Sequence, residues 1–303
     1  MAYIVGVDVG GTTIKFGFFD DHAELLEKFS IETVITHEPQ DLLDMIASTI
    51  EQKIPLEDLL GIGIGVPGPV INGVVQGAVN LDWKIVDVKG YFQLRLPGVN
   101  VLVHNDANIA ALGEASFGER PYRNMVLITL GTGVGGGVIL EGKIWSGTHG
   151  VGGEIGHMRV SEDGILCNCG LKGCLETIAS ATGIKRRAKH YLERSEPSIL
   201  TEPFSAKAIF EAAKQGDVLA LKVIEDLSET LAKALQNLAV VLDPEAFVLG
   251  GGVSHAGEFL RAKVEEKFAL MAFGQQAKNI QITLASLGND AGIYGCLKAV
   301  LDA

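Results

Sequence analysis

Four side chains that commonly bind transition metals lie close together in the sequence. They are one histidine and three of the chain's four cysteines: His157, Cys167, Cys169 and Cys174. One imidazole and three thiolates suit tetrahedral zinc, and because four protein ligands leave no open position, such a zinc would be structural. Buried thiols are also ordinary in protein cores. The spacing C-x-C-x4-C among glycines nevertheless favours a metal site.

Two carboxylates flank this group of ligands. Glu154 lies shortly before His157, and Glu176 lies shortly after Cys174. A structural zinc would hold the histidine and both carboxylates in fixed positions. We therefore expect residues 153–176 to surround a polar ligand.

Length and composition narrow the class of protein. The chain has 303 residues, of which 47% are hydrophobic and 38 are glycine. This favours a glycine-rich α/β protein with two lobes. The net charge of −12 argues against nonspecific binding to nucleic acid or to an anionic membrane. Because we see no signal peptide, no apolar run of ~18 residues and thiols arranged for a metal, we expect a soluble, cytoplasmic protein.

The elements that would position a ligand begin with a glycine turn. Strands are expected at residues 3–9 and 14–19, with a third strand at 23–31. The tip between the first two strands carries backbone and side-chain donors: Gly10, Gly11, Thr12, Thr13 and Lys15. Such a tip can bind a phosphate, although Gly-Gly is equally common in plain hairpins. Because no helix follows the glycines directly, the turn is neither a Rossmann fingerprint nor a Walker A loop.

A polar segment follows the next two elements. A helix is expected at 38–53 and a strand at 60–66, which ends in Val66-Pro67-Gly68-Pro69. Two prolines around a glycine form a stiff turn, and such a turn after a strand usually lies at the edge of a cleft. A hairpin at 70–78 then leads to Asn80-Leu81-Asp82-Trp83.

Asp106 occupies a position that is typical of catalytic residues in α/β proteins. A strand at 99–103 runs into His104-Asn105-Asp106-Ala107-Asn108, and an alanine-rich helix is expected at 107–116. Asp106 therefore lies where the carboxyl edge of a sheet meets a helix N-terminus. The alternative is a simple N-cap aspartate, and one side chain can serve both purposes.

The glycine turn occurs a second time, and a third glycine run follows later. A strand at 125–130 ends in the glycine-rich segment 131–137, and its hairpin partner is expected at 138–140. Two phosphate-type hairpins in separate halves predict a duplicated lobe plan with a cleft between the lobes. The third run, Gly250-Gly251-Gly252, follows a strand at 247–249 and suits either the approach of a base or ribose or simple close packing.

Most of the C-terminal half is predicted to be helical. The remaining elements are helices 177–192, 205–215 and 221–242, a helix from about 254, a strand at 280–285 and a helix at 290–301. Lys185, Arg186, Arg187 and Lys189 of the first helix form a basic face that is interpreted most simply as solvated. The apolar stripe of helix 221–242 fits the core better than a dimer interface.

Several of these segments together resemble one protein family. They are Asp8-Val9-Gly10-Gly11-Thr12, Asn105-Asp106-Ala107-Asn108, residues 130–137, Gly153-Glu154-Ile155-Gly156-His157 and the Cys-x-Cys-Gly-x-x-Gly-Cys-x-Glu run. Their combination closely resembles the ROK family (repressors, unclassified reading frames and sugar kinases) of the actin-like ATPase superfamily. The resemblance covers nearly the whole chain. Within that family, residues 65–69 and 80–83 are most similar to the bacterial ATP-dependent glucokinases.

The resemblance implies a fold and a reaction. It implies a two-lobed actin-like (ribonuclease H-like) α/β fold whose interlobe cleft holds ATP and a hexose. The small lobe would comprise residues 1–116 and 290–303, and the large lobe, with the structural zinc site, residues 117–289. Asp106 would be the general base that accepts the proton of the sugar 6-hydroxyl as this group attacks the γ-phosphoryl group. Asp8 would act on the phosphates through Mg²⁺ and its waters.

The resemblance also implies two sets of binding residues. ATP would contact Asp8, Gly10, Gly11, Thr12, Thr13, Lys15, Gly131, Thr132, Gly133, Gly250, Gly251 and Gly252. The sugar would contact Gly65, Asn80, Asn105, Asp106, Glu154, His157 and Glu176. Several convergent polar groups are what a ring of hydroxyls requires. His157 would bind zinc through one ring nitrogen and a sugar hydroxyl through the other.

Other functions remain open at this point. A sugar-responsive repressor would need a DNA-binding helix-turn-helix before the first strand, for which the sequence leaves no room. A nicotinamide-dependent oxidoreductase is disfavoured because the glycines join strand to strand. Kinases for N-acetylmannosamine, N-acetylglucosamine, fructose or allose share most of these residues, but Val66-Pro67 disfavours the first, in which an arginine is expected nearby. The resemblance suggests a homodimer or homotetramer and leaves open whether polyphosphate replaces ATP.

Overall fold

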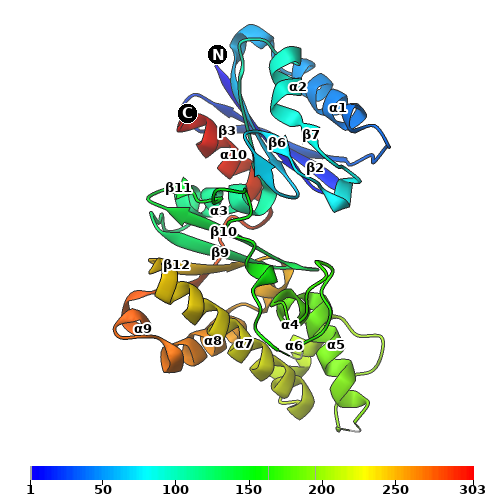
Figure 1. The fold of residues 1–303 in the computed structure, drawn as a ribbon, viewed down its shortest axis with the longest axis vertical. Coiled ribbons are helices and arrows are strands. Elements are labelled where there is room, and N and C mark those ends of the chain that lie inside the picture. Colours follow the sequence, from blue (N-terminus) through cyan, green and yellow to red (C-terminus); the bar gives the residue numbers. More distant parts are fainter. Residues whose placement is uncertain (1, 163, 195) are drawn as a thin grey trace. The chain divides into compact units, whose positions relative to one another are not determined.

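The computed structural model describes residues 2–162, 164–194 and 196–303, so Asp163 of the predicted metal segment lies outside the described residues. The chain divides into two compact units (Figure 1). The first unit comprises Met1–Arg123, Gly137–Gly152 and Ser286–Ala303, and the second comprises Asn124–Gly136 and Gly153–Ala285.

A five-stranded sheet forms the centre of the first unit. Its strands are β1 (Tyr3–Val9), β2 (Thr13–Asp20), β3 (Leu25–Glu32), β4 (Leu59–Val66) and β8 (Asn100–Asn105). In space the order is β3-β2-β1-β4-β8, with antiparallel pairing from β3 to β1 and parallel pairing from β1 to β8. The antiparallel half follows from the glycine turn, because strands joined by a short hairpin must reverse direction.

Helices cover both faces of this sheet because its strands carry two alternating sets of apolar side chains. Val7 belongs to a buried cluster with α1 (Pro39–Glu51) and α2 (Val88–Arg95). Ile4 packs on the opposite face against α10 (Ala291–Leu301). Figure 1 shows α1 and α2 over one face and α10 over the other.

Glycines allow α10 to lie directly against the backbone of its neighbours. A Cβ on Gly295 of α10 would lie 1.7 Å from the carbonyl oxygen of Ile109 in α3 (Asp106–Phe117). A Cβ on Gly63 of β4 would lie 2.4 Å from the carbonyl oxygen of Cys296. Because neither site has room for a side chain, α10 is locked between the backbones of α3 and β4.

The second sheet repeats the strand plan of the first. Its strands are β9 (Met125–Leu130), β10 (Val134–Leu140), β11 (Lys143–Ile144), β12 (Ala246–Gly250) and β13 (Gln281–Leu284). Their order is β11-β10-β9-β12-β13, with β9, β12 and β13 parallel and β10 and β11 antiparallel. The duplicated strand plan predicted from the two glycine hairpins is thus confirmed.

β10 is longer than the sequence analysis expected. It begins at Val134, so the expectation of a glycine loop over 131–137 was wrong beyond residue 133. Glycine is needed within the strand because a Cβ on Gly136 would lie 2.8 Å from the carbonyl oxygen of Gly153, besides 2.5 Å from the side chain of Ile155. A Cβ on Gly137 would likewise lie 2.8 Å from the carbonyl oxygen of Ala107 in α3.

This packing accounts for a difference between the compact units and the lobes expected from the sequence. Residues 117–123, 137–152 and 286–289 belong with the first unit, whereas the sequence-based division had assigned them to the large lobe. From Gly137 onward β10 lies against α3. The backbone N–H groups of Ser286 and Leu287 donate to Glu114 of the same helix, at 3.0 and 2.7 Å.

Shorter strands, turns and the remaining helices complete the chain. The first unit also contains β5 (Val70–Ile71), β6 (Val74–Val75), β7 (Val86–Asp87), η1 (Leu56–Asp58), η2 (Val79–Leu81) and η5 (Gly288–Asp290). The second contains η3 (Ile155–His157), α4 (Glu176–Ala179), α5 (Ala181–Leu192), α6 (Ala206–Lys214), α7 (Val218–Leu242), η4 (Gly252–Ala256), α8 (Glu258–Met271) and α9 (Gln276–Asn279). Within the described ranges, no helix has both the length and the apolar character that a membrane crossing demands.

α7 is the longest helix, and its apolar stripe belongs to the core, as the sequence analysis favoured. Ile224, Leu227, Leu231 and Leu235 are all buried. The helix begins after Asp217, whose carboxylate accepts hydrogen bonds from the backbone N–H groups of Ala220 and Ile199 and from the Ser198 hydroxyl. Burial would raise the pKa of Asp217, but these hydrogen bonds outweigh it and lower the pKa.

Replacement of Asp217 by alanine should lower the free energy of unfolding by about 1–2 kcal/mol at pH 7, because α7 loses its N-cap. The folded-state pKa lies below the ordinary value of 3.8. The carboxylate therefore stabilises fully above that value, and its contribution disappears as the pH falls through the folded-state pKa. Urea unfolding of both proteins should give a difference that shrinks in acid. Asp21→Ala, at an exposed turn, is the control, and an equal loss from both substitutions would contradict the assignment.

Candidate active site

Three parallel strands bring two carboxylates to one edge of the first sheet. Asp8 of β1 pairs with Gly65 of β4, and Gly65 pairs with His104 of β8, just before Asn105 and Asp106. A Cβ on Gly65 would lie 3.8 Å from Asp8 Oδ1 and 3.7 Å from Asp106 Cα. The carboxyl edge of this sheet thus gathers Asp8, Gly65 and Asp106, and the sequence had predicted this location for Asp106.

Hydrogen bonds orient the Asp106 carboxylate. Asp106 is the first residue of α3, and the helix is capped by Asn105, whose Oδ1 accepts from the backbone N–H of Asn108 at 3.0 Å. Asn105 Nδ2 donates to the carbonyl oxygen of Gly68 at 3.1 Å and to Asp106 Oδ1 at 3.0 Å. Asp106 Oδ1 also accepts from the backbone N–H of Ala107 at 2.8 Å. The capping role therefore falls to Asn105, and Asp106 is held in place by its neighbours.

Burial and a neighbouring cation have opposite effects on the pKa of Asp8. Burial raises the pKa of Asp8, and Lys15 acts in the opposite direction. Lys15 Nζ lies 3.3 Å from Asp8 Oδ2 and donates to the carbonyl oxygen of Asn289 at 2.9 Å. Lys15, which was predicted to donate a hydrogen bond to a phosphate, is thus directed at Asp8. There it favours the ionised carboxylate that a Mg²⁺ site needs.

The first glycine turn is a narrow hairpin tip. The N–H of Gly10 donates to the carbonyl oxygen of Thr13 at 2.9 Å, and the side chains of Thr12 and Thr13 are exposed. Asn80 of η2 lies against this tip, since a Cβ on Gly11 would be 3.3 Å from Asn80 Cβ. The tip and Asn80 are thereby brought together within the first unit.

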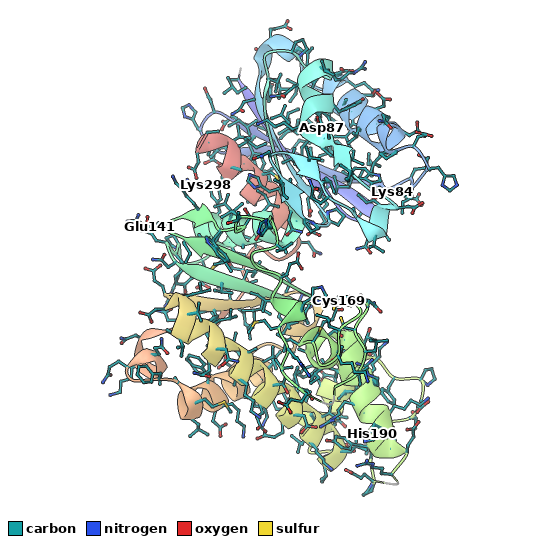
Figure 2. All side chains as sticks on the ribbon, in the orientation of Figure 1. Lys84, Asp87, Glu141, Cys169, His190 and Lys298 are labelled. Atoms are coloured by element: carbon teal, nitrogen blue, oxygen red, sulfur yellow. The ribbon has the colours of Figure 1, made fainter. Side chains whose placement is uncertain are left out.

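The four predicted metal ligands meet in the second unit. One ring nitrogen of His157 and the sulfurs of Cys167, Cys169 and Cys174 all lie within 4.8 Å of one another. Cys167 Sγ is 3.7 Å from His157 Nδ1, and Cys169 Sγ is 3.6 Å from Cys174 Sγ. Tetrahedral zinc with Zn–S bonds of ~2.3 Å would place two sulfurs ~3.8 Å apart, so the spacing fits such an ion. Figure 2 marks Cys169 in the second unit.

The thiols of this cluster have unequal acidities. Burial raises the pKa of Cys167 and raises that of Cys174 to about 12. The backbone N–H of Leu171 lowers the pKa of the exposed Cys169. Because the two buried thiols resist ionisation by themselves, a cation bound among them is what would hold them as thiolates. The donor set thus fits zinc in its chemistry as well as in its spacing.

Of the two flanking glutamates, Glu176 places its carboxylate beside this cluster, and Glu154 contacts it through the backbone. Glu154 is exposed, and its carbonyl oxygen accepts from the backbone N–H of His157 at 3.1 Å. Glu176 is half-buried: its Oε2 accepts from the backbone N–H of Val134 at 3.0 Å, and its Oε1 is 3.6 Å from Cys167 Sγ. The predicted sugar ligands therefore form two sets, each within its own unit. The first set is Gly65, Asn80, Asn105 and Asp106, and the second is Glu154, His157 and Glu176.

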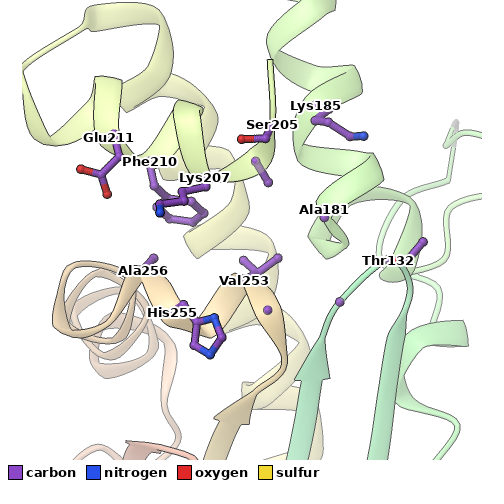
Figure 3. Close-up of a pocket in the computed structure, with 13 residues that line it drawn as sticks. Thr132, Ala181, Lys185, Ser205, Lys207, Phe210, Glu211, Val253, His255 and Ala256 are labelled. Carbon is purple, nitrogen blue, oxygen red and sulfur yellow. The ribbon is translucent and has the colours of Figure 1, made fainter. Parts of the chain in front are cut away.

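A cavity of about 660 Å³ opens in the second unit (Figure 3). Three residues predicted to bind ATP line it: Gly131, Thr132 and Gly252. The other lining residues come from the starts of α5 and α6 and from η4: Ala181, Lys185, Ser205, Ala206, Lys207, Phe210, Glu211, Val253, His255 and Ala256. The volume is that of a small-molecule site. Lys185 and Lys207 outnumber the one lining carboxylate, Glu211, so the cavity favours an anionic ligand.

The sequence analysis missed most of this cavity. Lys185 was interpreted as part of a solvated basic face, yet it lines the cavity, as do Lys207 and His255 from distant segments. The local signals were Gly131, Thr132 and Gly252, the first residue of η4. At Gly251, close packing explains the glycine, since φ is 80° and a Cβ would lie 2.6 Å from the carbonyl oxygen of Leu130.

Comparisons with known proteins agree with this architecture. Residues 4–303 match the family model described as ROK family. The glucokinase of Halalkalibacterium halodurans is 42% identical, over 97% of this chain and 93% of that protein. The glucokinase of Thermotoga maritima is 35% identical, over 98% of this chain and 96% of that protein. A ROK family glucokinase from Streptomyces griseus, solved in complex with glucose and AMPPNP, aligns over 100% of both chains with a TM-score of 0.79 and 34% identity.

Two sheets of the same strand order, a carboxylate-bearing strand edge and two glycine hairpins define an α/β protein with the two-lobed actin-like ATPase fold. The fold class predicted from the sequence is confirmed. Within this class, the chain belongs to the ROK family.

Replacement of Asn105 by alanine should lower the free energy of unfolding by about 1 kcal/mol, because α3 loses its cap. Asn105→Ser keeps an acceptor for the N–H of Asn108 without placing a second carboxylate beside Asp106, and should retain most of that stability. Urea unfolding of the two variants and the wild type measures the difference. Equal destabilisation by both substitutions would show that the cap does not account for the role of Asn105 in stability.

Proposed function

We propose that this chain is an ATP-dependent glucokinase, which transfers the γ-phosphoryl group of ATP to the 6-hydroxyl of glucose. One observation carries the proposal. Asp8 and Asp106 share a sheet edge in a chain that aligns over its whole length with a ROK glucokinase solved with glucose and AMPPNP. In phosphoryl transfer the protein mainly positions the reacting groups and neutralises charge on the phosphates. Two carboxylates, one of them holding Mg²⁺, and the backbone N–H groups of two turns can do this.

Asp106 is the proposed general base. As the 6-oxygen of glucose bonds to the γ-phosphorus, the bond between that phosphorus and ADP breaks, and the hydroxyl proton passes to the Asp106 carboxylate. The hydrogen bonds from Asn105 and Ala107 set the orientation of this carboxylate before the sugar arrives. Such preorganisation lowers the cost of reaching a reactive geometry.

Asp8 and the two glycine turns are the proposed phosphate site. Mg²⁺ bound with ATP neutralises charge on the phosphates, and Asp8 is the carboxylate placed to hold it, directly or through water. In the turns 10–13 and 131–133, the N–H groups of Gly10 and Gly131 bond within the turn, and the backbone N–H groups that follow them donate to phosphate oxygens. The cavity beside Thr132 and Gly252 is the proposed site of the nucleoside, with Lys185 and Lys207 adding positive charge.

Glucose recognition is proposed for both sets of polar residues described above. We further propose that zinc occupies the cluster of one histidine and three cysteines, where it would fix the ring of His157 and the backbone on either side. A homodimer or homotetramer in the cytoplasm, with no nucleic-acid or membrane partner, stays a prediction, as does the interlobe cleft.

The wild-type chain should form glucose 6-phosphate and ADP from glucose and Mg·ATP in a coupled assay. Asp106→Asn should lower kcat by about 10²- to 10⁴-fold while it leaves glucose affinity nearly unchanged, because only the proton acceptor is lost. Asp87→Asn is the matched control, since Asp87 caps α2 and asparagine is an equally good cap. Fast turnover of N-acetylmannosamine, N-acetylglucosamine, fructose or allose with none of glucose would refute the assignment, and binding of promoter DNA in a gel shift would favour a repressor.

Replacement of Cys169 by alanine should lower zinc content, stability and glucose affinity together, because the same ion holds the loop and the ring of His157. Calorimetry with glucose, metal analysis and thermal unfolding measure the three quantities. Cys296→Ala is the control, because it removes a buried thiol outside the cluster and should reduce stability alone. A folded, zinc-free Cys169→Ala protein with unchanged glucose affinity would contradict the proposed coupling between zinc and glucose binding.

A further inference from the structure

Val134, the first residue of β10, is contacted at its N–H and at its carbonyl group by the two segments that carry the predicted metal ligands. Its N–H donates to Glu176 Oε2 at 3.0 Å, and Glu176 follows the last ligand, Cys174, by two residues. On the carbonyl side, a Cβ on Gly156 would lie only 2.0 Å from the oxygen of Val134. Because Gly156 directly precedes His157, the backbone at one end of the ligand set and the Glu176 side chain at the other end contact the same residue of the hairpin.

The turn that precedes Val134 is tied to the same part of the chain. The N–H of Ala181 donates to the carbonyl oxygen of Gly131 at 2.8 Å, and the hydroxyl of Thr182 donates to that of Thr132 at 3.3 Å. Figure 3 shows Thr132 at the hairpin tip beside Ala181 at the start of α5. The segment that starts at the last metal ligand therefore contacts both residues of the turn that line the cavity.

Glu176 also fills the space next to the third residue of the turn. A Cβ on Gly133 would lie 2.3 Å from Glu176 Oε2. The carboxylate thus packs against the turn as well as accepting a hydrogen bond at its end. Backbone N–H groups bind phosphate well only when they already point at it, because ordering a loose turn costs binding free energy.

We propose that Glu176 is a positioning residue for the nucleotide, through which the metal cluster keeps the turn 131–133 in its phosphate-binding form. Loss of the metal frees the segment around Cys174, Glu176 moves, and the turn loses its anchor at Val134. Nucleotide binding weakens even when no sugar is present. This inference rests on the proposed function and extends it, since the metal then serves the nucleotide side of the reaction as well as the sugar side.

The test measures binding of Mg·AMPPNP by calorimetry in the absence of glucose. Glu176→Ala should weaken binding about tenfold or more while it keeps about one zinc per chain, and Cys169→Ala should weaken binding similarly while it loses zinc. Glu176→Gln is the matched control, because its amide oxygen still accepts from the N–H of Val134, and it should bind close to the wild-type level. Hydrogen exchange of residues 131–136 should be faster in Glu176→Ala than in Glu176→Gln.

Each result bears on one of the two proposals. Unchanged Mg·AMPPNP affinity in folded Glu176→Ala protein would overturn the positioning role, because a sugar ligand alone has no effect when sugar is absent. Glu176→Asp, which withdraws the carboxylate from Val134 by one methylene, replaces Glu176→Ala if that variant does not fold, and the same loss is expected. A wild-type protein that binds no Mg·AMPPNP would instead overturn the proposed kinase function.

Discussion

The parallel register of β1, β4 and β8 is the constraint on which the first unit depends. Gly65 stands between Asp8 and Asp106 only in this register, and a shift by one residue would turn the side chain of Asp8 to the other face of the sheet. The register is held in turn by α10, which packs so closely on Gly63 that no side chain fits between them. Apolar packing on one face of the sheet therefore decides where the polar groups lie at its edge.

Carboxylates that accept hydrogen bonds from backbone N–H groups fix the loops around this framework. Glu114, only 4% exposed, accepts from the backbone of Ser286 and Leu287, where the chain returns to the first unit. Glu176 accepts from Val134 at the base of the second glycine turn. A charged acceptor makes such bonds stronger than those between neutral groups. Hydrogen bonds of the same kind thus fix the path of the chain in one unit and the second glycine turn in the other.

Much of the site was predictable because its signals are local in the sequence. The four predicted metal ligands fall within a short stretch, and a glycine pair between two apolar runs predicts a hairpin whatever the rest of the chain does. The position of Asp106, after a strand and at the start of a helix, was predictable in the same way. The extent of β10 was not predictable, since Gly135 to Gly137 look like a turn until the packing of Ile155 and Ala107 is known.

By itself, then, the sequence determined most of the longer strands and helices, the cluster of one histidine and three cysteines, the two glycine hairpins and the position of Asp106 at the start of α3. Only the tertiary structure decided which partners these residues have. It directed Lys15 at Asp8, assigned the helix cap to Asn105, and lined the cavity with Lys185, Lys207 and His255. The physical reason is that periodicity and spacing act over a few residues, whereas these contacts join segments that meet only after the sheets and helices have packed.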